Sequence, residues 1–265
     1  MFDQQQLKKI FRPGSRLTPS IWQLLILVQL ILLLLTWFTT GNVLFPNPIE
    51  IVQAEARLIL EQNLLEHLGK SLGLSLKAVG MTLLIALPLC YATVIPFFRP
   101  LGLLISKLRF TTPVGISFLF LIMFGGGQVL QLSILTFAMS VFFVTSMIAE
   151  IDNIPKTEYN HARTIFGNEW RVTWEVVVLG KFHNVLDLTR QNFAITWMML
   201  TLVEGLVRSG GGIGVLLLDN NKLFRMDAVF AIQITIILTG IALDWAFGFI
   251  RKTLCPYANL TLEKS

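Results

Sequence analysis

The longest uncharged stretch constrains the fold of this chain more than any other feature. Residues 110–149 contain no Asp, Glu, Lys or Arg. A helix needs about 20 apolar residues to cross the hydrocarbon core of a membrane, so a run of 40 residues is too long for one crossing. The glycines at 125–127 interrupt the run near its middle. We therefore predict two transmembrane helices here, over 110–124 and 128–149.

Four more apolar stretches, of 13 to 23 residues, predict further crossings: Ile21–Thr40, Ala78–Phe98, Gln191–Val203 and about Ala228–Ile250. The shortest is extended on its inner side by 185–189. The first follows basic residues, as a signal peptide would, but it is longer than a typical signal core and no small-residue cleavage site follows it. We expect it to be an uncleaved span. The sequence thus predicts an all-α, polytopic membrane protein with six transmembrane helices.

The charged residues agree with this topology. Only 14% of the chain is charged, against about a quarter in soluble domains, which excludes an ordinary soluble enzyme. With the basic N-terminus inside, 15 of the 21 Lys and Arg residues fall in cytoplasmic segments, as the positive-inside rule requires. No nucleic-acid partner is then needed to explain the net charge of +5. The expected organisation is a cytoplasmic segment at 1–20, a transmembrane domain at 21–250 with inner loops at 99–109 and 150–190, and a cytoplasmic tail at 251–265.

The first outer segment, 41–77, has a helical pattern. Apolar residues recur on one face while glutamates occupy the other, which predicts an amphipathic helix at about 48–70. Its apolar stripe is formed by Ile51, Ala54, Leu58, Leu65 and Leu68. The helix either packs on the membrane surface or the helix bundle, or serves as a docking site for an extracellular partner.

The cytoplasmic loop at about 150–183 carries a second helical pattern, in which two short helical pieces flank Gly167. Phe166, Trp170 and Trp174 recur every four residues, and this spacing predicts that they share one helix face. An aromatic face in a cytoplasmic loop has two possible partners. It packs against the inner ends of this protein's own helices, or it enters a groove on a separate cytoplasmic protein.

The same loop resembles the EAA loop of ABC importer permeases, in which E-A-A, three residues and a glycine are followed by I-x-L-P. Ala162 and Gly167 match this motif, with Arg163 and the preceding Pro155 also in place. The chain departs from it at three positions: Asn160 replaces Glu, His161 replaces the first Ala, and Gly180 replaces Pro. In that family the loop forms a coupling helix that sits in a cleft of the ATPase subunit. The resemblance therefore assigns ATPase coupling to Asn160, His161, Ala162, Arg163, Phe166, Gly167 and Trp170.

Further motifs in the same order extend the resemblance from about Phe45 to Tyr257. They are Pro46-Asn47-Pro48, the segments His67–Leu72, Phe118–Gly127 and Ser209–Gly214 with Glu204 before it, and Arg225–Phe230 followed by Leu243-Asp244. Their shared order is typical of the nitrate, sulfonate, taurine and bicarbonate branch of type I ABC importers. Membership implies the MetI-like permease fold in the bacterial inner membrane, with both termini in the cytoplasm.

The resemblance also implies a set of partners. A second permease copy would complete the pathway, two ABC ATPase subunits would supply energy from ATP and Mg²⁺, and an extracytoplasmic binding protein would deliver a small solute of the anion or sulfonate class. The chain carries no cofactor of its own in this scheme. Its only Gly-Lys pairs begin at Gly69 and Gly180, with Leu64 and Glu175 where the first glycine of a P-loop belongs. We therefore expect a transport subunit that is not itself an enzyme. An ion-driven secondary transporter is the alternative.

Three polar residues are candidates for the solute pathway. Glu204 lies at the outer end of the fifth predicted span, where a carboxylate faces a cavity or a partner. It either contributes to the pathway and its outer gate or pairs with Arg208, one turn further on. Gln128 and Gln131 lie at the outer start of the fourth span and either line the pathway or hydrogen-bond between helices.

The remaining polar features predict structural roles. The glycines at 210–212 form either a flexible loop or a nest of backbone N–H groups for an anion. Asp244 is placed to pair with a basic residue near the cytoplasm. The histidines are dispersed and Cys90 lies within an apolar span, so we predict neither catalytic residues nor a metal site.

Overall fold

The computed structural model describes residues 18–39 and 46–255, which form helices joined by short loops and contain no strand. The helices are α2 (Pro19–Thr39), α3 (Pro48–Glu61), α4 (Leu64–Ala92), α5 (Arg99–Lys107), α6 (Pro113–Phe124), α7 (Gln128–Asp152), α8 (Lys156–Phe166), α9 (Glu169–Thr173), α10 (Phe182–Leu206), α11 (Ile213–Lys222) and α12 (Met226–Leu254). Short 3₁₀ turns lie at Leu108–Phe110 and Arg208–Gly210, and a π-helical turn at Trp174–Leu179 leads from α9 towards α10. The all-helical class is confirmed.

Within the described residues, four helices are long and apolar enough to cross a membrane: α2, α4, α7 and α12. A fifth candidate is a broken span made of residues 99–110 and 114–124, whose two halves meet at 118°. Helix α10 falls outside these candidates because its first half carries several charged and amide side chains. These helices support a polytopic membrane protein, and the number of six spans stays a prediction.

The third predicted span differs from the expected 110–124. Phe110 ends a 3₁₀ turn that continues α5, and α6 begins only at Pro113. The Thr112 side chain caps α6 by accepting a hydrogen bond from the Gly115 backbone N–H at 3.3 Å. The 12 residues of α6 extend for about 18 Å, which is too short to cross a membrane alone.

The expected outer helix at 48–70 is divided in two. Asn47 and Glu50 form a capping box that starts α3, and the residues Ile51, Ala54 and Leu58 are buried where α3 packs on α12. Asn63 then adopts a left-handed conformation with φ of 49°, which ends this helical path. Helix α4 starts at Leu64, so the apolar stripe does not continue along one helix.

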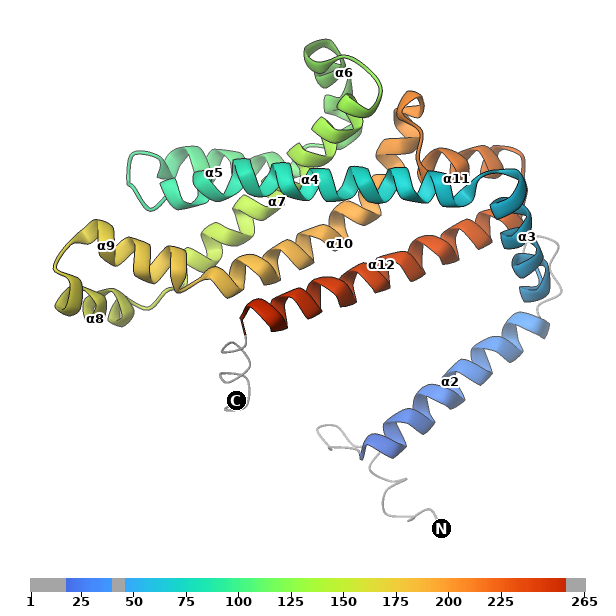
Figure 1. Ribbon diagram of the computed structural model, residues 1–265, viewed down its shortest axis with the longest axis horizontal. Coiled ribbons are helices and arrows are strands. Elements are labelled where there is room, and N and C mark those ends of the chain that lie inside the picture. Colours follow the sequence, from blue (N-terminus) through green and yellow to red (C-terminus); the bar gives the residue numbers. More distant parts are fainter. Residues whose placement is uncertain (1–17, 40–45, 256–265) are drawn as a thin grey trace.

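The body of the molecule is a bundle in which α4, α7, α10 and α12 run along its length (Figure 1). Helix α7 packs against both α4 and α10. One apolar cluster fills the half of the bundle near α3 and α11, around Ile134, Leu200 and Ile232. A second fills the half near α8 and α9, around Phe143, Met147 and Val177. The α8–α9 segment and the α3–α11 end therefore lie at opposite ends of the molecule.

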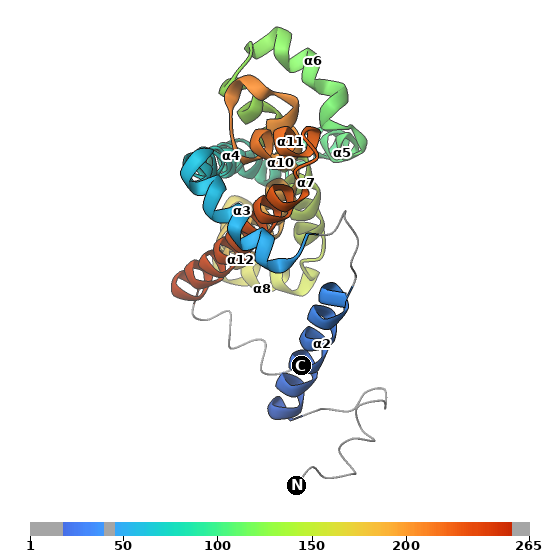
Figure 2. The ribbon, with the colours of Figure 1, turned by 90° about the vertical axis from the view of Figure 1, so that its right-hand side faces the viewer.

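Helix α2 stands apart from this body (Figure 2). The indole N–H of Trp37 donates to the Pro46 carbonyl at 3.1 Å, and the Trp37 ring lies 6.4 Å from that of Phe230. Most of its other described side chains are exposed apolar groups, including Leu27, Leu30 and Leu33. A face of this kind is suited to contact with lipid or another helix.

Candidate functional site

Helices α8 and α9 form a bent pair at one end of the bundle. Gly167 ends α8 with φ of +63°, and its backbone N–H donates to the Arg163 carbonyl at 3.1 Å. Asn168 then caps α9 by accepting the Trp170 backbone N–H at 3.0 Å. A glycine is suited to Gly167 because residues with a Cβ rarely adopt the left-handed conformation. The break predicted at this glycine is therefore present, and its geometry is defined on both sides.

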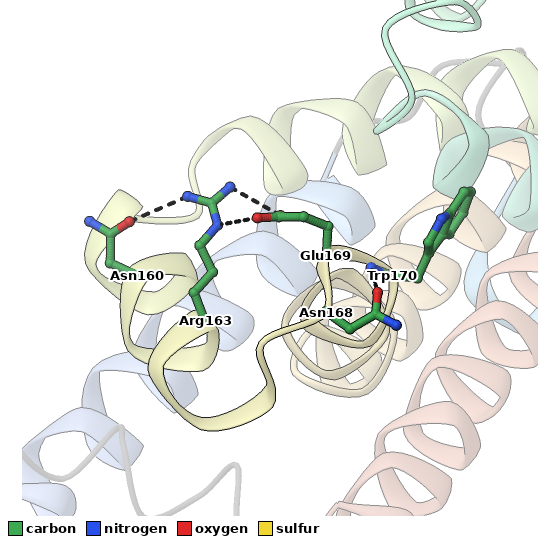
Figure 3. A network of polar contacts seen from close by, with 5 residues as sticks. All are labelled: Asn160, Arg163, Asn168, Glu169 and Trp170. Carbon is green, nitrogen blue, oxygen red and sulfur yellow. Dashed lines mark hydrogen bonds and ion pairs between the residues drawn. The ribbon is translucent and has the colours of Figure 1, made fainter.

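Arg163 ties the two helices together across the bend (Figure 3). Its guanidinium donates to both carboxylate oxygens of Glu169, at 2.8 and 3.1 Å, and to the side-chain oxygen of Asn160 at 3.4 Å. The hydrogen bonds and charge of Glu169 raise the pKa of Arg163 above its ordinary value. Asn160, one of the departures from the EAA pattern, thus supports the arginine through its amide oxygen.

The inner face of the pair is anchored in the bundle. Ala162 is buried, and so are Val172 and Val177 on the following helical turns. Tyr159 packs partly buried against the same apolar cluster, and this burial raises the pKa of its hydroxyl. The α8–α9 segment is therefore attached to the bundle by apolar contacts, and its orientation depends on them.

The outer face of the pair exposes two tryptophans. Trp170 is 72% exposed and Trp174 is 57% exposed, whereas Phe166 is half-buried with its ring 5.0 Å from the Arg171 guanidinium. The prediction of one continuous face through Phe166, Trp170 and Trp174 is wrong, since α8 ends at Phe166 and the chain turns at Gly167. Two exposed tryptophans on a rigid support are nevertheless typical of a protein-binding surface.

A groove of about 540 Å³ separates this pair from the turn between α4 and α5. Its rim is charged: Arg99 donates to both carboxylate oxygens of Asp152, at 2.9 and 3.0 Å, opposite Arg163 and Glu169. Trp170 lines the groove as well, whereas His161 is exposed on α8 outside it. Of the residues predicted for coupling, Arg163 and Trp170 thus line one groove, and Asn160 is bonded to Arg163 beside it.

A second polar cluster lies at the opposite end, around Glu204. The Glu204 side chain is fully buried, and its carboxylate accepts the Ser71 hydroxyl at 2.6 Å and the Gly214 backbone N–H at 2.8 Å. The Ser71 oxygen in turn accepts the Ile213 backbone N–H at 2.8 Å. Glu204 therefore joins α10 to α4 and to the first turn of α11, and its carboxylate contacts no cavity described in the structure.

Gln131 holds the loop before α11 by hydrogen bonds as well. Its buried amide donates to the carbonyls of Val207 and Gly211, at 2.9 and 3.0 Å. A Cβ at Gly210 would overlap the Gln131 side chain, and one at Gly212, whose φ is +118°, would overlap the Glu204 carboxylate. The loop from Arg208 to Gly212 is thus tightly packed. Of the two interpretations of Gln131, interhelical hydrogen bonding is the one observed.

The backbone N–H groups after the glycines donate to side chains of the molecule itself. Those of Ile213 and Gly214 point to Ser71 and Glu204, and the Gly212 carbonyl lies 3.1 Å from the Nδ1 atom of His67. The N–H groups of Gly210 and Gly211 donate to the carbonyls of Val207 and Arg208, at 3.3 and 3.1 Å, so these two glycines do not form the predicted anion nest. Sequence reasoning missed Ser71 and His67, although both lie in the segment that resembles the family motif.

The ion pairs differ from one expectation and agree with another. Arg208 pairs with Asp219 of α11, so the suggested pairing of Arg208 with Glu204 is wrong. Asp244 accepts two hydrogen bonds of 2.5 Å from Arg190, as the structural interpretation of this carboxylate predicts. Asp187 pairs with Arg251 at 2.8 Å between the same two helices. Helices α10 and α12 are thereby joined twice near the α8–α9 end.

Gln128 lies apart from Glu204 and Gln131. It lines a cavity of about 630 Å³ between α4 and α7, together with Lys70 and Lys77 of α4. The three residues predicted for the pathway are thus not one site: two are buried in the loop cluster and one lines a cavity. No signal in the sequence distinguished them, because all three lie at the outer ends of apolar segments.

Comparison with known proteins gives independent information on the kind of protein this chain is. No family model matches the sequence. Over 148 residues, 56% of this chain and 55% of the relative, it is 28% identical to a putative ABC transporter permease protein of Methanocaldococcus jannaschii. Over 241 residues, 86% of this chain and 87% of the relative, it is 21% identical to the taurine transport system permease protein TauC of Escherichia coli. The chain is similar to ABC transporter permeases. The match spans only about half of the archaeal protein's length. The four long apolar helices of the described residues, together with these relatives, support an integral membrane protein.

Proposed function

We propose that this chain is the membrane-spanning subunit of an ATP-driven importer in the bacterial inner membrane. Separate ABC ATPase subunits bind the α8–α9 segment, and a binding protein delivers a small solute to the end near α3 and α11. The observation that carries the proposal is the α8–α9 pair itself, with its buried inner face and its exposed Trp170 and Trp174. The similarity to TauC over 86% of the chain supports the same function and favours the sulfonate branch of importers.

The build of the α8–α9 pair is suited to transmitting force. An exposed tryptophan buries a large area when it enters a groove on a partner, so such residues dominate binding energy. Movement of the partner would displace Ala162 and Val172, which are packed against the bundle. The π-helical turn then connects the pair to α10, which is joined to α12 by its two ion pairs. A mechanical path thus runs from the ATPase surface to two helices of the bundle.

The proposed topology has six crossings with both termini in the cytoplasm. Helices α2, α4, α7 and α12 cross as single helices, and α5 with α6 crosses as one broken span. Helix α10 supplies the remaining crossing. Its charged side chains Asp187 and Arg190 are paired with Arg251 and Asp244 of α12, which lowers the cost of placing them near the membrane.

A second copy of the chain would complete the pathway, as one bundle supplies half of it. The exposed apolar faces of the bundle are compatible with both lipid and this second copy. ATP and Mg²⁺ bind to the partner ATPases. The mass of the detergent-solubilised complex tests this arrangement, since a single permease copy per complex would contradict it.

The coupling proposal is tested by substituting Gly167→Val. A valine disfavours the φ of +63°, so the bend between α8 and α9 is disturbed, although a Cβ there meets no heavy atom of the described residues. We expect co-purification of the ATPase subunits to fall at least tenfold, with ATP-dependent taurine uptake into proteoliposomes lost. Gly125→Val is the matched control, because Gly125 has φ of +79° and equally open space but lies at the end of α6.

Normal ATPase binding and normal coupled uptake in Gly167→Val would contradict the proposal. Uptake that persists without ATP and follows an ion gradient would instead support the secondary transporter. If Gly125→Val lost ATPase binding to the same degree, the effect would be attributed to general destabilisation and not to the coupling surface.

A further inference from the structure

A cavity between α4 and α7 lies near the α3–α11 end, and apart from Gln128 its lining residues have no function assigned above. Its volume is about 630 Å³, within the range of small-molecule sites. The α4 side supplies Glu66, Gly69, Lys70, Gly73, Leu74 and Lys77, and the α7 side supplies Gln128, Val129 and Leu132. It lies along the exposed face of α4, next to the loop cluster: Lys70 lines it, and the following residue, Ser71, bonds the buried Glu204.

Lys77 occupies an unusual position for a lysine. It lies 13 residues after the start of α4 and 15 before its end, so it is near the middle of a helix long enough to cross a membrane. It directly precedes the predicted crossing Ala78–Phe98, and a lysine at the edge of the hydrocarbon extends its ammonium into water or towards a partner. Its presence among the cavity residues indicates that this face of α4 is in contact with water.

The charges around the cavity leave an excess of one positive charge. Lys70 forms an ion pair of 2.7 Å with Glu66, one turn earlier on α4. Lys77 has no carboxylate within ion-pair distance among residues 18–39 and 46–255. Of the three charged groups that line the cavity, two therefore neutralise each other and the Lys77 ammonium remains available to a ligand.

Glycines keep this side of the cavity open. A Cβ at Gly69, Gly73 or Gly80 would meet no heavy atom of the described residues within 4 Å. Glycine is less favourable than alanine inside a helix, and here no packing within the described chain requires it. Gly69 and Gly73 line the cavity one turn apart, so they widen the space in front of Lys77.

The other lining groups indicate the kind of ligand. Leu74, Val129 and Leu132 provide apolar contacts, and the Gln128 amide provides a hydrogen-bond donor. A single ammonium, one amide and an apolar wall are suited to a small anion with a short organic part. An alkyl sulfonate has this chemistry.

We infer that the cavity is an anion subsite on the solute path, with Lys77 as its charged contact. The inference rests on the proposed transport function and gives the anions that the family resemblance implies a charged contact on this chain. It places the path along the glycine-containing face of α4, whereas the buried Glu204 and Gln131 hold the neighbouring loop in position. Lys77 then attracts the anion into the cavity by charge, and the apolar wall contacts its organic part.

The test measures charge and water access at Gly73, which lies one turn from Lys77. Gly73→Cys is reconstituted in lipid nanodiscs as the full chain and treated with methanethiosulfonate reagents of similar size, one anionic and one cationic. The two native cysteines, Cys90 and Cys255, are buried and serve as the unmodified background. Leu238→Cys on the exposed apolar face of α12 is the lipid-facing control and should react slowly with both.

We expect Gly73→Cys to react with both reagents and faster with the anionic one. Adding Lys77→Gln should slow the anionic reagent about threefold and speed the cationic one by a similar factor, as expected for one charge about 7 Å away in water. Lys222→Gln, a charge removed from α11 outside the cavity, should leave both rates unchanged. Methanesulfonate should protect the thiol, whereas dimethyl sulfone, its neutral analogue of similar size, should not, and protection should be lost in Lys77→Gln.

Three results would overturn the inference. Equal protection by methanesulfonate and dimethyl sulfone would show that the cavity does not select ligands by charge. Reaction rates unaffected by Lys77→Gln would show that Lys77 is not its charged contact. Spontaneous disulfide formation between two Gly73→Cys chains would show that a second copy covers this face. None of these measurements uses ATP or the ATPase, so failure here is distinguishable from failure of the coupling proposal, which Gly167→Val tests separately.

Discussion

The two ends of the bundle both contain a glycine-bearing loop, but the loops are built in opposite ways. The loop at Gly167 is open: its glycine has free space, and Trp170 beside it is 72% exposed. The loop at Gly210–Gly212 is closed, because Gln131 and Glu204 fill the space next to its glycines and satisfy its backbone groups. The open loop presents side chains to a partner, whereas the closed loop maintains its own shape. Substitutions at the two ends should therefore affect different measurements.

The largest effect is expected from Gly212→Val in the closed loop. The new side chain would overlap the Glu204 carboxylate and would strain a residue with φ of +118°. Strain and overpacking together should lower the free energy of unfolding by about 3 kcal/mol or more. Thermal unfolding in detergent measures it, with Gly167→Val as the open-loop counterpart, which has backbone strain without overlap and should lose clearly less stability. Equal losses of stability at the two glycines would end the distinction between the loops.

Glu204→Ala should cause the next largest loss of folding stability. It leaves the Ser71 hydroxyl and the Gly214 N–H without their acceptor in a buried place, at a cost of about 2–3 kcal/mol. Glu204→Gln keeps one acceptor oxygen and should lose less. Uptake by either variant should fall only with the amount of folded protein. A changed solute affinity at unchanged thermal stability would show that Glu204 belongs to the pathway after all.

Trp170→Ala, at the open loop, should affect partner binding and leave the stability of the chain almost unchanged. Removing an exposed tryptophan should change thermal stability by no more than about 0.5 kcal/mol. Its loss from the ATPase contact should weaken binding of the ATPase subunits about tenfold or more. Titration of purified ATPase against the nanodisc-embedded chain provides the measurement. Ile165→Ala is the control for general loss of apolar surface, because Ile165 is an exposed apolar residue on the neighbouring helix α8. Unchanged affinity would place the contact elsewhere on the α8–α9 pair.

The smallest effect is expected from Glu169→Gln. The Arg163–Glu169 pair is exposed, so water and salt screen it, and thermal stability should hardly change. The pKa of Arg163, which Glu169 raises, should return towards its ordinary value without any change of charge near neutral pH. A fall in ATPase binding at low salt that disappears at high salt would indicate that the pair also orients Trp170.

The sequence predicted much of the inner end because its signals are local. The helix break at Gly167 needs only the glycine and the cap residue Asn168 that follows it. The spacing of Phe166, Trp170 and Trp174 was misleading for the same reason, since periodicity assumes a continuous helix and the break removes Phe166 from that face. The burial of Ala162 depends on which helices lie behind α8, and the sequence pattern contains no information on them.

The outer end was less predictable because its partners are distant along the chain. Glu204 bonds to Ser71, 133 residues away, and Gln131 bonds to a carbonyl 80 residues away. Apolar periodicity places such residues in a helix but does not state which neighbour each one faces. The same holds for Lys77, whose position beside the cavity followed only from the packing of α4 against α7.

The sequence by itself determined the membrane class, the helical content and the position of the bend at Gly167. These properties follow from local rules: backbone hydrogen bonds within a helix connect residues four apart, and apolar segments partition into lipid by composition. The tertiary structure alone decided that Glu204 and Gln131 are buried in a closed loop, that α5 and α6 meet at a sharp angle, and that Lys77 faces a cavity. Each of these depends on the packing of helices distant in sequence, where a buried polar group must find whichever partner the packing brings within reach.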